Sequence, residues 1–296
     1  MDQIRLKAYG KINLGLDVLG RREDGYHEVR MIMQSVRIYD DLTLKKSREP
    51  GIRVTTNRSF LPTGEGNLVY KAAKILIDAC GIKEGILIDL KKFLPVAAGM
   101  AGGSSDAAAV LCGMNQLFSL GLTQEKLMEY GLRVGADVPF CIMRGTVLAE
   151  GIGEVLKPLP APPPCHVLLA KPAVSVSTKT VYEQIDQRTI TAHPDIDGMI
   201  SAISAQDLKG LAGTLGNVLE LVTGELYPQI GEIERFMKEK GALGAIMSGS
   251  GPTVFGLFED DADAQKAYTS LKEERLAKQV YLTTFFEKRQ AKGSNR

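Results

Sequence analysis

The chain has 296 residues, of which 44% are hydrophobic and 24% are charged, a composition typical of an ordinary globular protein. This length exceeds what one hydrophobic core usually fills, so we expect two domains. The formal net charge of +1 gives the molecule no overall field that would attract a polyanion or an anionic membrane surface. Nucleic acid and membranes are therefore not expected as partners.

The cysteines, the histidines and the N-terminus indicate where in the cell the protein is located and whether it binds a metal. The four cysteines form no CxxC pair, and the three histidines stand too far apart to make a histidine metal cluster. Dispersed cysteines are typical of a reducing cytosol, and no metal site made of protein side chains alone is expected. The N-terminus carries no plastid transit peptide and no apolar core of signal-peptide length, and no apolar run is long enough to span a bilayer. A bacterial cytoplasmic location is predicted.

In chain order, the first clear pattern is an alternation of apolar and polar residues over 11–19, which predicts a half-buried strand. Each residue of a strand rises about 3.3 Å, so Lys11 and Asn13 are expected about 7 Å apart on the polar face. For a lone lysine, the wet face of an edge strand is the more usual explanation.

A turn follows at residues 20–25, where Asp24-Gly25 suits the positive φ of a tight connection. Tyr26 and His27 come directly after the turn and begin a strand toward Ile38. The resulting hairpin brings Tyr26 and His27 into the neighbourhood of Lys11, although an exposed Tyr-His pair at a turn is commonly incidental.

The next elements are strands over 42–45 and 52–56, followed by a helix that Asn67 caps and Gly81 ends. Two basic pairs in this part of the chain are interpreted as solvated surface. They are Lys45-Lys46 and Lys91-Lys92.

A glycine-rich stretch lies between an apolar strand at 86–90 and an alanine-rich helix that runs to about Leu120. Small residues allow a ligand to approach the backbone, and a helix N-terminus offers unpaired amides and positive potential. Ser104 and Ser105 suit the helix N-cap and can donate to phosphate oxygens. We interpret this stretch as a phosphate-binding loop, here called the cradle, formed by Pro95, Val96, Ala97, Ala98, Gly99, Met100, Ala101, Gly102, Gly103, Ser104 and Ser105.

The cradle differs from two common phosphate-binding motifs. The chain contains no GxxxxGK[ST] segment, and the cradle does not spell GxGxxG with an acidic residue about 20 positions on. A flexible glycine connector is the alternative interpretation.

Asp137 follows a predicted helix over 124–134, which Thr123 caps. It is expected in a turn before an apolar strand, because Pro139 favours an extended approach. Two interpretations stay open from the residues alone. The carboxylate either bonds to local amides or acts as general base for a substrate hydroxyl, beside a lysine that keeps it ionised.

The second half of the chain begins with a proline-rich run at 158–164, interpreted as a stiff linker. It predicts a boundary between one domain at 1–160 and another at 161–296. A strand over 167–170 and a helix that contains Tyr182 come next, and Tyr182 on its own is explained by packing. Further helices are expected at 196–203, 208–222 and 230–240.

The last elements read β-β-α-β over residues 245–285, which predicts an α/β plait. Residues 248–251 lie between its first two strands and form either a plain hairpin turn or an anion nest. The tail at 291–296 is expected to be disordered.

The chain resembles the GHMP small-molecule kinases over most of its length. The segments that carry the resemblance, in the family's order, are Gly10–Leu16, Asp24–His27, Pro95–Ala108, Gly135–Phe140 and Met247–Thr253. The resemblance implies an α+β fold of two domains with the active site in the cleft between them. The N-terminal domain is then a mixed α/β domain with a left-handed β-α-β unit, and the C-terminal domain is an α/β plait.

The activity implied is phosphoryl transfer from ATP to an alcohol, with Mg²⁺ carried by the ATP. The Lys-Ile-Asn-Leu strand and the Asp-Gly-Tyr-His turn are similar to members of the non-mevalonate isoprenoid route, which phosphorylate an erythritol hydroxyl of a cytidine diphosphate derivative. The family roles then fall on residues of this chain. Asp137 is the base and Lys11 its electrostatic partner, Asn13 orients the substrate, Tyr26 and His27 form the cytidine pocket, and the cradle holds the triphosphate. Tyr182 stacks on the other side of the base, and residues 248–251 support the cradle.

The cradle departs from the family at two positions. The usual Gly-Leu-Gly-Gly-Gly-Ser-Ser reads here Gly-Met-Ala-Gly-Gly-Ser-Ser, with Met100 and Ala101 in the second and third places. Methionine preserves an apolar plug, and alanine is expected to need a negative φ.

Alternatives are another GHMP kinase, of the mevalonate or homoserine type, and a non-catalytic ligand-binding relative. The Asp-Gly-Tyr-His turn argues against the first, and the presence of Lys11 and Asp137 argues against the second. Binding to RNA is disfavoured by the near-neutral charge. The oligomeric state is left open.

Overall fold

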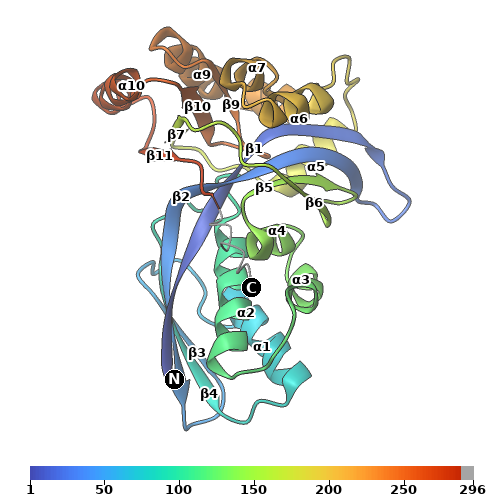
Figure 1. Ribbon diagram of the computed structural model, residues 1–296, viewed down its shortest axis with the longest axis vertical. Coiled ribbons are helices and arrows are strands. Elements are labelled where there is room, and N and C mark those ends of the chain that lie inside the picture. The colour runs from blue at the N-terminus through green and yellow to red at the C-terminus, as the bar shows by residue number, and fades with distance from the viewer. Residues whose placement is uncertain (288–296) are drawn as a thin grey trace, which may run out of the picture.

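A computed structural model describes residues 1–287 and contains two β-sheets (Figure 1). Two long antiparallel strands, β1 (Gln3–Arg21) and β2 (His27–Ser47), run from the lower lobe of the molecule into the upper lobe. They form the centre of a seven-stranded sheet with the order β3-β4-β2-β1-β8, in which β5 pairs with both β2 and β6. The other strands are β3 (Ile52–Thr56), β4 (Gly85–Lys91), β5 (Thr146–Glu150), β6 (Val155–Leu159) and β8 (Gly216–Asn217).

Four helices pack in the lower lobe: α1 (Leu68–Cys80), α2 (Gly102–Leu117), α3 (Gln124–Leu132) and α4 (Val138–Met143). The strands β3 and β4 are parallel neighbours joined through α1, so the β-α-β unit is present. Asn67 caps α1 by accepting a 3.1 Å hydrogen bond from the Val69 amide, and Gly81 ends it at φ +63°. The predicted boundaries of this helix are confirmed.

The upper lobe contains a four-stranded antiparallel sheet with the order β11-β7-β10-β9. Its strands are β7 (His166–Lys171), β9 (Gly244–Met247), β10 (Val254–Phe258) and β11 (Gln279–Thr284). Taken in sequence order, these strands are arranged 4-1-3-2, which is the order of an α/β plait. The prediction of a C-terminal plait is confirmed.

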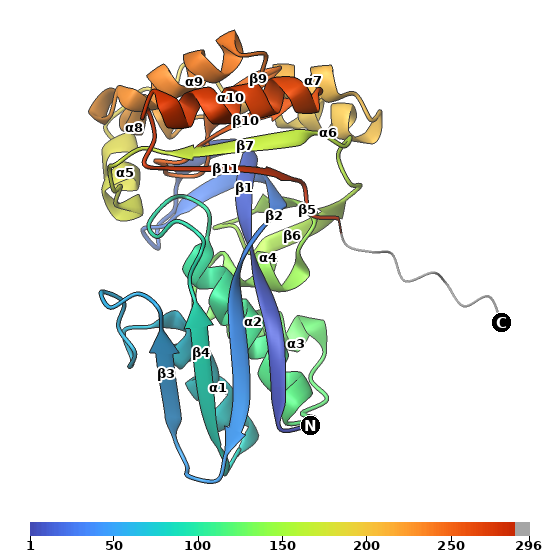
Figure 2. The same cartoon turned by 90° about the vertical axis from the view of Figure 1, so that its left-hand side faces the viewer.

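The helices of the upper lobe are α5 (Thr178–Ile185), α6 (Ile196–Ser204), α7 (Leu208–Gly213), α8 (Glu220–Leu226), α9 (Gln229–Glu239) and α10 (Asp261–Glu273). Helices α9 and α10 cover one face of the plait sheet, and the upper ends of β1 and β2 lie on its other side (Figure 2). Apolar residues of both sheets, among them Ile12, Leu14, Val167 and Phe255, form one buried cluster at this contact.

Packing against the plait changes the expected environment of β1. The strand was predicted to be half-buried, but residues 10–18 are all buried. The plait covers Ile12 and Leu14, and α6 lies against Gly15 on the side expected to be wet. A register shift between Asn13 and Gly15 also breaks the predicted alternation, since Ile12 and Leu14 join one core cluster and Leu16 joins the other.

Other differences concern element boundaries. The strand expected over 42–45 is the continuation of β2, and the helix expected over 208–222 divides into α7, β8 and α8. The predicted linker at 158–164 is shorter, because Pro158 and Leu159 belong to β6, which pairs with β5. Neither β5 nor β6 was predicted. The expected disorder at 291–296 lies outside the described residues.

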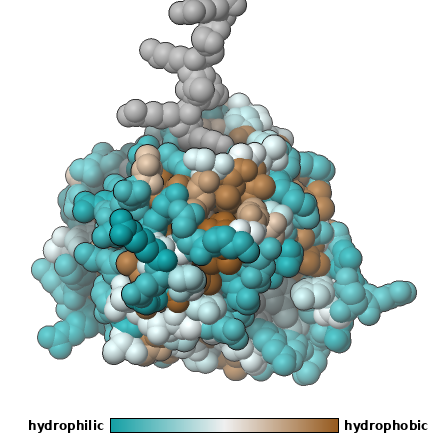
Figure 3. Space-filling view, turned by 90° about the horizontal axis from the view of Figure 1, so that it is seen from below, coloured by the Kyte–Doolittle hydropathy of each residue, from teal (hydrophilic) through white to brown (hydrophobic). Residues whose placement is uncertain are grey.

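The face at the lower end of the molecule is mainly polar (Figure 3). Seen from below, hydrophilic side chains cover most of this end of the molecule, and an apolar patch lies among them (Figure 3). Within residues 1–287, no helix combines the length and the apolar character needed to cross a membrane.

Candidate active site

A cavity of about 1050 Å³ lies where the β1–β2 hairpin, the cradle, the start of α4, α5 and the β9–β10 turn meet. It brings together predicted site residues from distant parts of the sequence. These are Lys11, Asn13, Tyr26, His27, Asp137 and Tyr182, with all cradle residues except Met100 and Ser105.

Lys11, Asn13 and Asp137 form the polar centre of the cavity. The Lys11 Nζ donates a 2.6 Å hydrogen bond to Asn13 Oδ1 and lies 3.9 Å from Asp137 Oδ2. Lys11 and Asn13 are almost completely buried, whereas the Asp137 side chain is 33% exposed. The lysine is thus a fixed buried cation, and the carboxylate beside it is open to a ligand.

The segment that carries Asp137 is helical rather than extended. Asp137 is the N-cap of α4, and Pro139 lies in the first turn, where a missing amide costs nothing. The predicted apolar strand is therefore wrong, because a proline at this position suits a helix start as well as an extended chain. Burial and, in second place, the Asp137 carboxylate raise the pKa values of the Cys141 thiol and the Tyr182 hydroxyl.

The cradle reaches its shape through left-handed backbone at small residues. Ala97 and Ala101 adopt φ values of +50° and +52°, and Gly99 adopts +71°. The expectation that Ala101 needs a negative φ is wrong, because Ala101 is itself the left-handed N-cap of α2. Ser104 and Ser105 consequently lie in the first turn of α2 and do not cap it.

The two remaining cradle positions face inward. Met100 is 1% exposed and packs in the hydrophobic cluster between the sheets, as an apolar plug does. The Ser105 hydroxyl donates to the carbonyl of Tyr9. Of the two serines, Ser104 is the one whose side chain is available on the cavity wall.

The β9–β10 turn at residues 248–251 joins the plait to the cradle. The Ser248 hydroxyl donates a 3.0 Å hydrogen bond to the Gly99 carbonyl and accepts a 3.2 Å bond from the Asn13 amide. Asn217 holds the turn from behind, donating from Nδ2 to the carbonyls of Met247 and Gly249. The turn therefore supports the cradle, as the resemblance implied.

Sequence reasoning missed a buried ion cluster beside the cradle, of which Lys92 and Asp106 reach the cavity wall. Lys92, predicted to be solvated, is 3% exposed and contacts Asp40 and Asp106, with 2.7 Å between its Nζ and Asp106 Oδ2. Burial raises the pKa of Asp106 well above its usual range, and the nearby Asp40 adds to this shift. Asp106 is a carboxylate among the buried, mostly apolar residues of α2. A buried carboxylate needs a cationic partner, and this signal could have identified Lys92.

The other end of the cavity is aromatic. The Tyr26 side chain is 60% exposed, and the rings of His27 and Tyr182 lie 4.8 Å apart. A carboxylate absent from the sequence-based expectations, Asp186, contacts His27 Nε2 at 2.6 Å and Arg21 Nη1 at 3.4 Å. The cavity thus combines the small residues of the cradle, a Lys-Asp centre and an aromatic end.

Two family models match the chain. The GHMP kinases N terminal domain matches residues 67–145, and the GHMP kinases C terminal domain matches residues 199–277. Together with the fold and the cavity, they define the class of protein, which is an ATP-dependent small-molecule kinase.

Similar proteins narrow the class. The chain is 55% identical to 4-diphosphocytidyl-2-C-methyl-D-erythritol kinase of Lachnospira eligens, over 97% of this chain and 99% of that protein. It is 53% identical to the kinase of the same name from Lachnoclostridium phytofermentans, again over 97% and 99%. A crystal structure of 4-(cytidine 5'-diphospho)-2C-methyl-D-erythritol kinase aligns with a TM-score of 0.83 and 31% identity, covering 96% of this chain and all of that one. The chain belongs to the GHMP kinases, in the family of 4-diphosphocytidyl-2-C-methyl-D-erythritol kinases.

Proposed function

We propose that this kinase transfers the γ-phosphoryl group of ATP to a hydroxyl on the erythritol part of 4-diphosphocytidyl-2-C-methyl-D-erythritol, in non-mevalonate isoprenoid biosynthesis. The observation that carries this proposal is that one cavity is lined by the cradle, the Lys11–Asp137 centre and the aromatic residues. These three parts provide for the nucleotide phosphates, the acceptor hydroxyl and the nucleoside base.

In the proposed mechanism, Asp137 accepts the proton of the acceptor hydroxyl. Its carboxylate is open to the cavity, and the buried Lys11 Nζ at 3.9 Å stabilises negative charge as the phosphoryl group moves. Asn13 fixes the lysine through the 2.6 Å hydrogen bond and orients the substrate. Phosphoryl transfer depends mainly on positioning and charge neutralisation, which this set of groups provides.

The cradle holds the triphosphate. Its left-handed residues bring backbone to the cavity surface, and the N-terminus of α2 contributes amides and a positive potential. Each amide that bonds to a charged phosphate oxygen contributes about 1.5–3 kcal/mol. The loop needs no lysine of the P-loop kind, because several such amides act together.

Mg²⁺ is proposed to arrive with ATP. Among residues 1–287, no three Asp, Glu, His or Cys side chains are grouped to hold a metal ion. Mg²⁺ commonly keeps several waters and binds nucleotide phosphates together with one or two protein oxygens. The hydroxyl of Ser104, on the cavity wall, is an oxygen donor that fits this need. When bound, the ion neutralises charge on the phosphates.

The aromatic end is proposed to bind cytidine. Tyr26 stacks on the base from the hairpin, Tyr182 covers it from α5, and His27 bonds to its edge. Tyr182 belongs to this set because its ring lies 4.8 Å from that of His27 and its side chain lines the same cavity.

The test is an ATP-consumption assay of the purified protein with four acceptors: the cytidylyl methylerythritol, mevalonate, phosphomevalonate and homoserine. Turnover with the cytidylyl compound alone is expected. Turnover with another alcohol would support the kinase activity but would contradict the proposal that the aromatic end binds cytidine. If none is phosphorylated by folded protein that binds ATP, a non-catalytic ligand-binding role replaces the proposal.

A further inference from the structure

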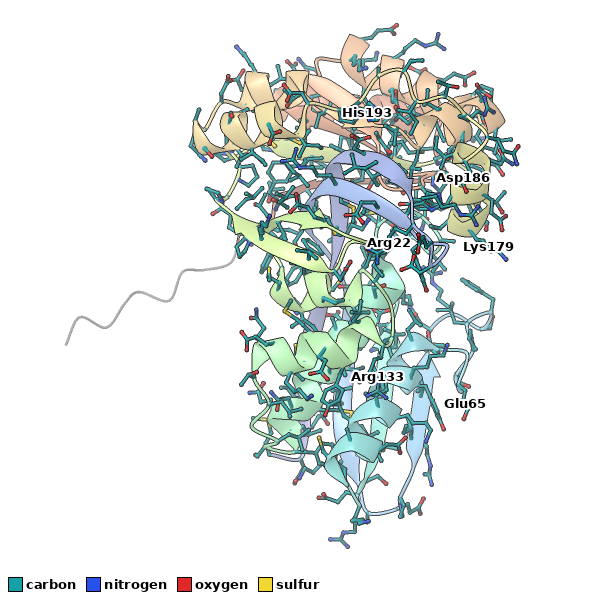
Figure 4. All side chains as sticks on the ribbon, turned by 90° about the vertical axis from the view of Figure 1, so that its right-hand side faces the viewer. Arg22, Glu65, Arg133, Lys179, Asp186 and His193 are labelled. Carbon is teal, nitrogen blue, oxygen red and sulfur yellow. The ribbon has the colours of Figure 1, made fainter. Side chains whose placement is uncertain are left out.

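The His27 ring is held by a carboxylate from the other half of the chain. Its Nε2 lies 2.6 Å from Asp186 Oδ1, and Arg21 contacts the second oxygen of Asp186 at 3.4 Å. Asp186 lies at the end of α5, beside the hairpin whose turn carries Arg22 (Figure 4). An ionised carboxylate only accepts hydrogen bonds, so the proton on this side must belong to Nε2.

In the neutral form of the ring, fixing the proton on one nitrogen determines the role of the other. A neutral imidazole carries a single N–H, so a ring that donates from Nε2 presents Nδ1 as an acceptor. Within residues 1–287, Nδ1 of His27 has no hydrogen-bond partner. The side chain is 10% exposed and lines the cavity beside Tyr26 and Tyr182, so its free edge is offered to a ligand there.

An acceptor at this position distinguishes the two pyrimidines. Cytosine carries an exocyclic amine, which donates, where uracil carries a carbonyl oxygen, which accepts. We propose that Asp186 is a positioning residue that holds His27 as an acceptor toward the base edge, and that this makes the site select a cytosine-type over a uracil-type substrate. The inference rests on the proposed function, because it takes the aromatic end as the nucleoside site.

A purely structural ion pair is the competing explanation. Asp186 ties α5 to the hairpin, as another pair, Arg188–Glu225, ties the following segment to α8. The structure also contains His193, whose Nδ1 contacts Asp17 at 2.8 Å, but that ring does not line the cavity. The position of His27 on the cavity wall is what sets its carboxylate partner apart.

The first arm of the test is the ring tautomer, which needs no substrate. With only three histidines in the chain, ¹⁵N spectra of labelled protein at about pH 9 resolve the His27 ring, because neutral imidazole prevails there. We expect a single tautomer with Nε2 protonated in the parent and a mixture in Asp186→Ala. A His27 ring protonated on Nδ1 in the parent would overturn the inference.

The second arm is the ratio of kcat/KM for the cytidylyl substrate to that for its uridylyl analogue. We expect Asp186→Ala to lower this ratio roughly 10- to 100-fold, because the ring can then turn either a donor or an acceptor to the base. Glu225→Ala removes an ion pair of the same region away from the cavity and should leave the ratio unchanged. If Asp186→Ala slows both substrates equally, its role is structural and the inference is wrong.

The two arms separate this inference from the proposed function. A parent enzyme with the expected tautomer but no activity on the cytidylyl substrate would overturn the proposed function and, with it, the base selection. An active, cytidine-selective parent whose ratio is insensitive to Asp186→Ala would overturn the inference alone.

Discussion

The Tyr26 ring is 60% exposed on the wall of the cavity, so it has an open face for a ligand and little packing to lose. We expect Tyr26→Ala to weaken binding of the cytidylyl substrate by about 1–3 kcal/mol, the range for base–aromatic stacking, with thermal stability nearly unchanged. Titration calorimetry measures the affinity. Phe60→Ala, which removes a ring 68% exposed outside the cavity lining, serves as the control. If Tyr26→Ala and the parent bind the cytidylyl substrate with equal affinity, Tyr26 does not contact the base.

At the scale of single residues, the sequence predicted chemical type but not burial. Lys11, Asn13 and Asp137 were predicted as site candidates, because a motif carries residue type and order, and all three line one cavity. The burial of Lys92 was not predictable, since the sequence Lys91-Lys92 reads the same whether one or both side chains are solvated. Its environment depends on Asp40 and Asp106, which lie 52 and 14 positions away along the chain.

At the scale of elements, the cradle depends on glycine where it meets the β9–β10 turn. Gly99 has φ +71°, and a Cβ there would overlap the carbonyl oxygen of Ser248. Gly121 has a similar φ of +68° but open space around it. We expect Gly121→Ala to cost about 1–2 kcal/mol of unfolding free energy from its backbone conformation alone.

Gly99→Ala should cost more than Gly121→Ala and should also weaken ATP binding, because backbone must move to admit the methyl group. Urea denaturation and nucleotide titration of the two variants measure these effects. Equal losses of stability with unchanged ATP affinity would show that the contact between Gly99 and Ser248 does not shape the cradle.

Elements with local signals were predicted well, and those set by tertiary contacts were not. Asn67 and Gly81 bound α1 as expected, because caps act within a turn of the helix. By contrast, β8 replaces part of a predicted helix because Gly216 and Asn217 pair with β1, some 200 positions earlier in the sequence. Hydrophobic spacing carries no information on such a partner.

At the scale of the whole molecule, folding stability should depend on a buried carboxyl pair behind the β9–β10 turn. Burial, with Glu234 as the second cause, raises the pKa of Glu220 to about 9. A carboxyl with a raised folded-state pKa stabilises the fold below its unfolded value of 4.5, and this contribution is lost as the pH rises toward 9.

We therefore expect Glu220→Gln to flatten the decline of unfolding free energy between about pH 5 and pH 9 and to be more stable than the parent at the alkaline end. Urea denaturation at several pH values measures this. Glu225→Gln, on the same helix, is the matched control, because Arg188 lowers the pKa of Glu225 and its titration falls below this window. An unchanged pH slope in Glu220→Gln would contradict the assignment.

The site itself is a property of the whole molecule. The Asn13 amide and the Ser248 hydroxyl that meet at its centre are 235 positions apart, and the cradle bonds to the same hydroxyl. The residues alone predicted that Lys11 and Asp137 lie on separate elements. Only the family resemblance predicted that they lie side by side. Helix α4 packs on β1 and so brings Asp137 to within 3.9 Å of Lys11, a contact that local patterns could not reveal.

The central claim is that Asp137, beside Lys11, is the base for phosphoryl transfer. Its most direct test is single-turnover transfer by Asp137→Asn at saturating ATP and cytidylyl substrate, with ATP affinity measured on the same protein. The account predicts transfer about 10²–10⁴-fold slower than in the parent, with the fold and ATP affinity retained. Transfer at the parent rate would contradict it.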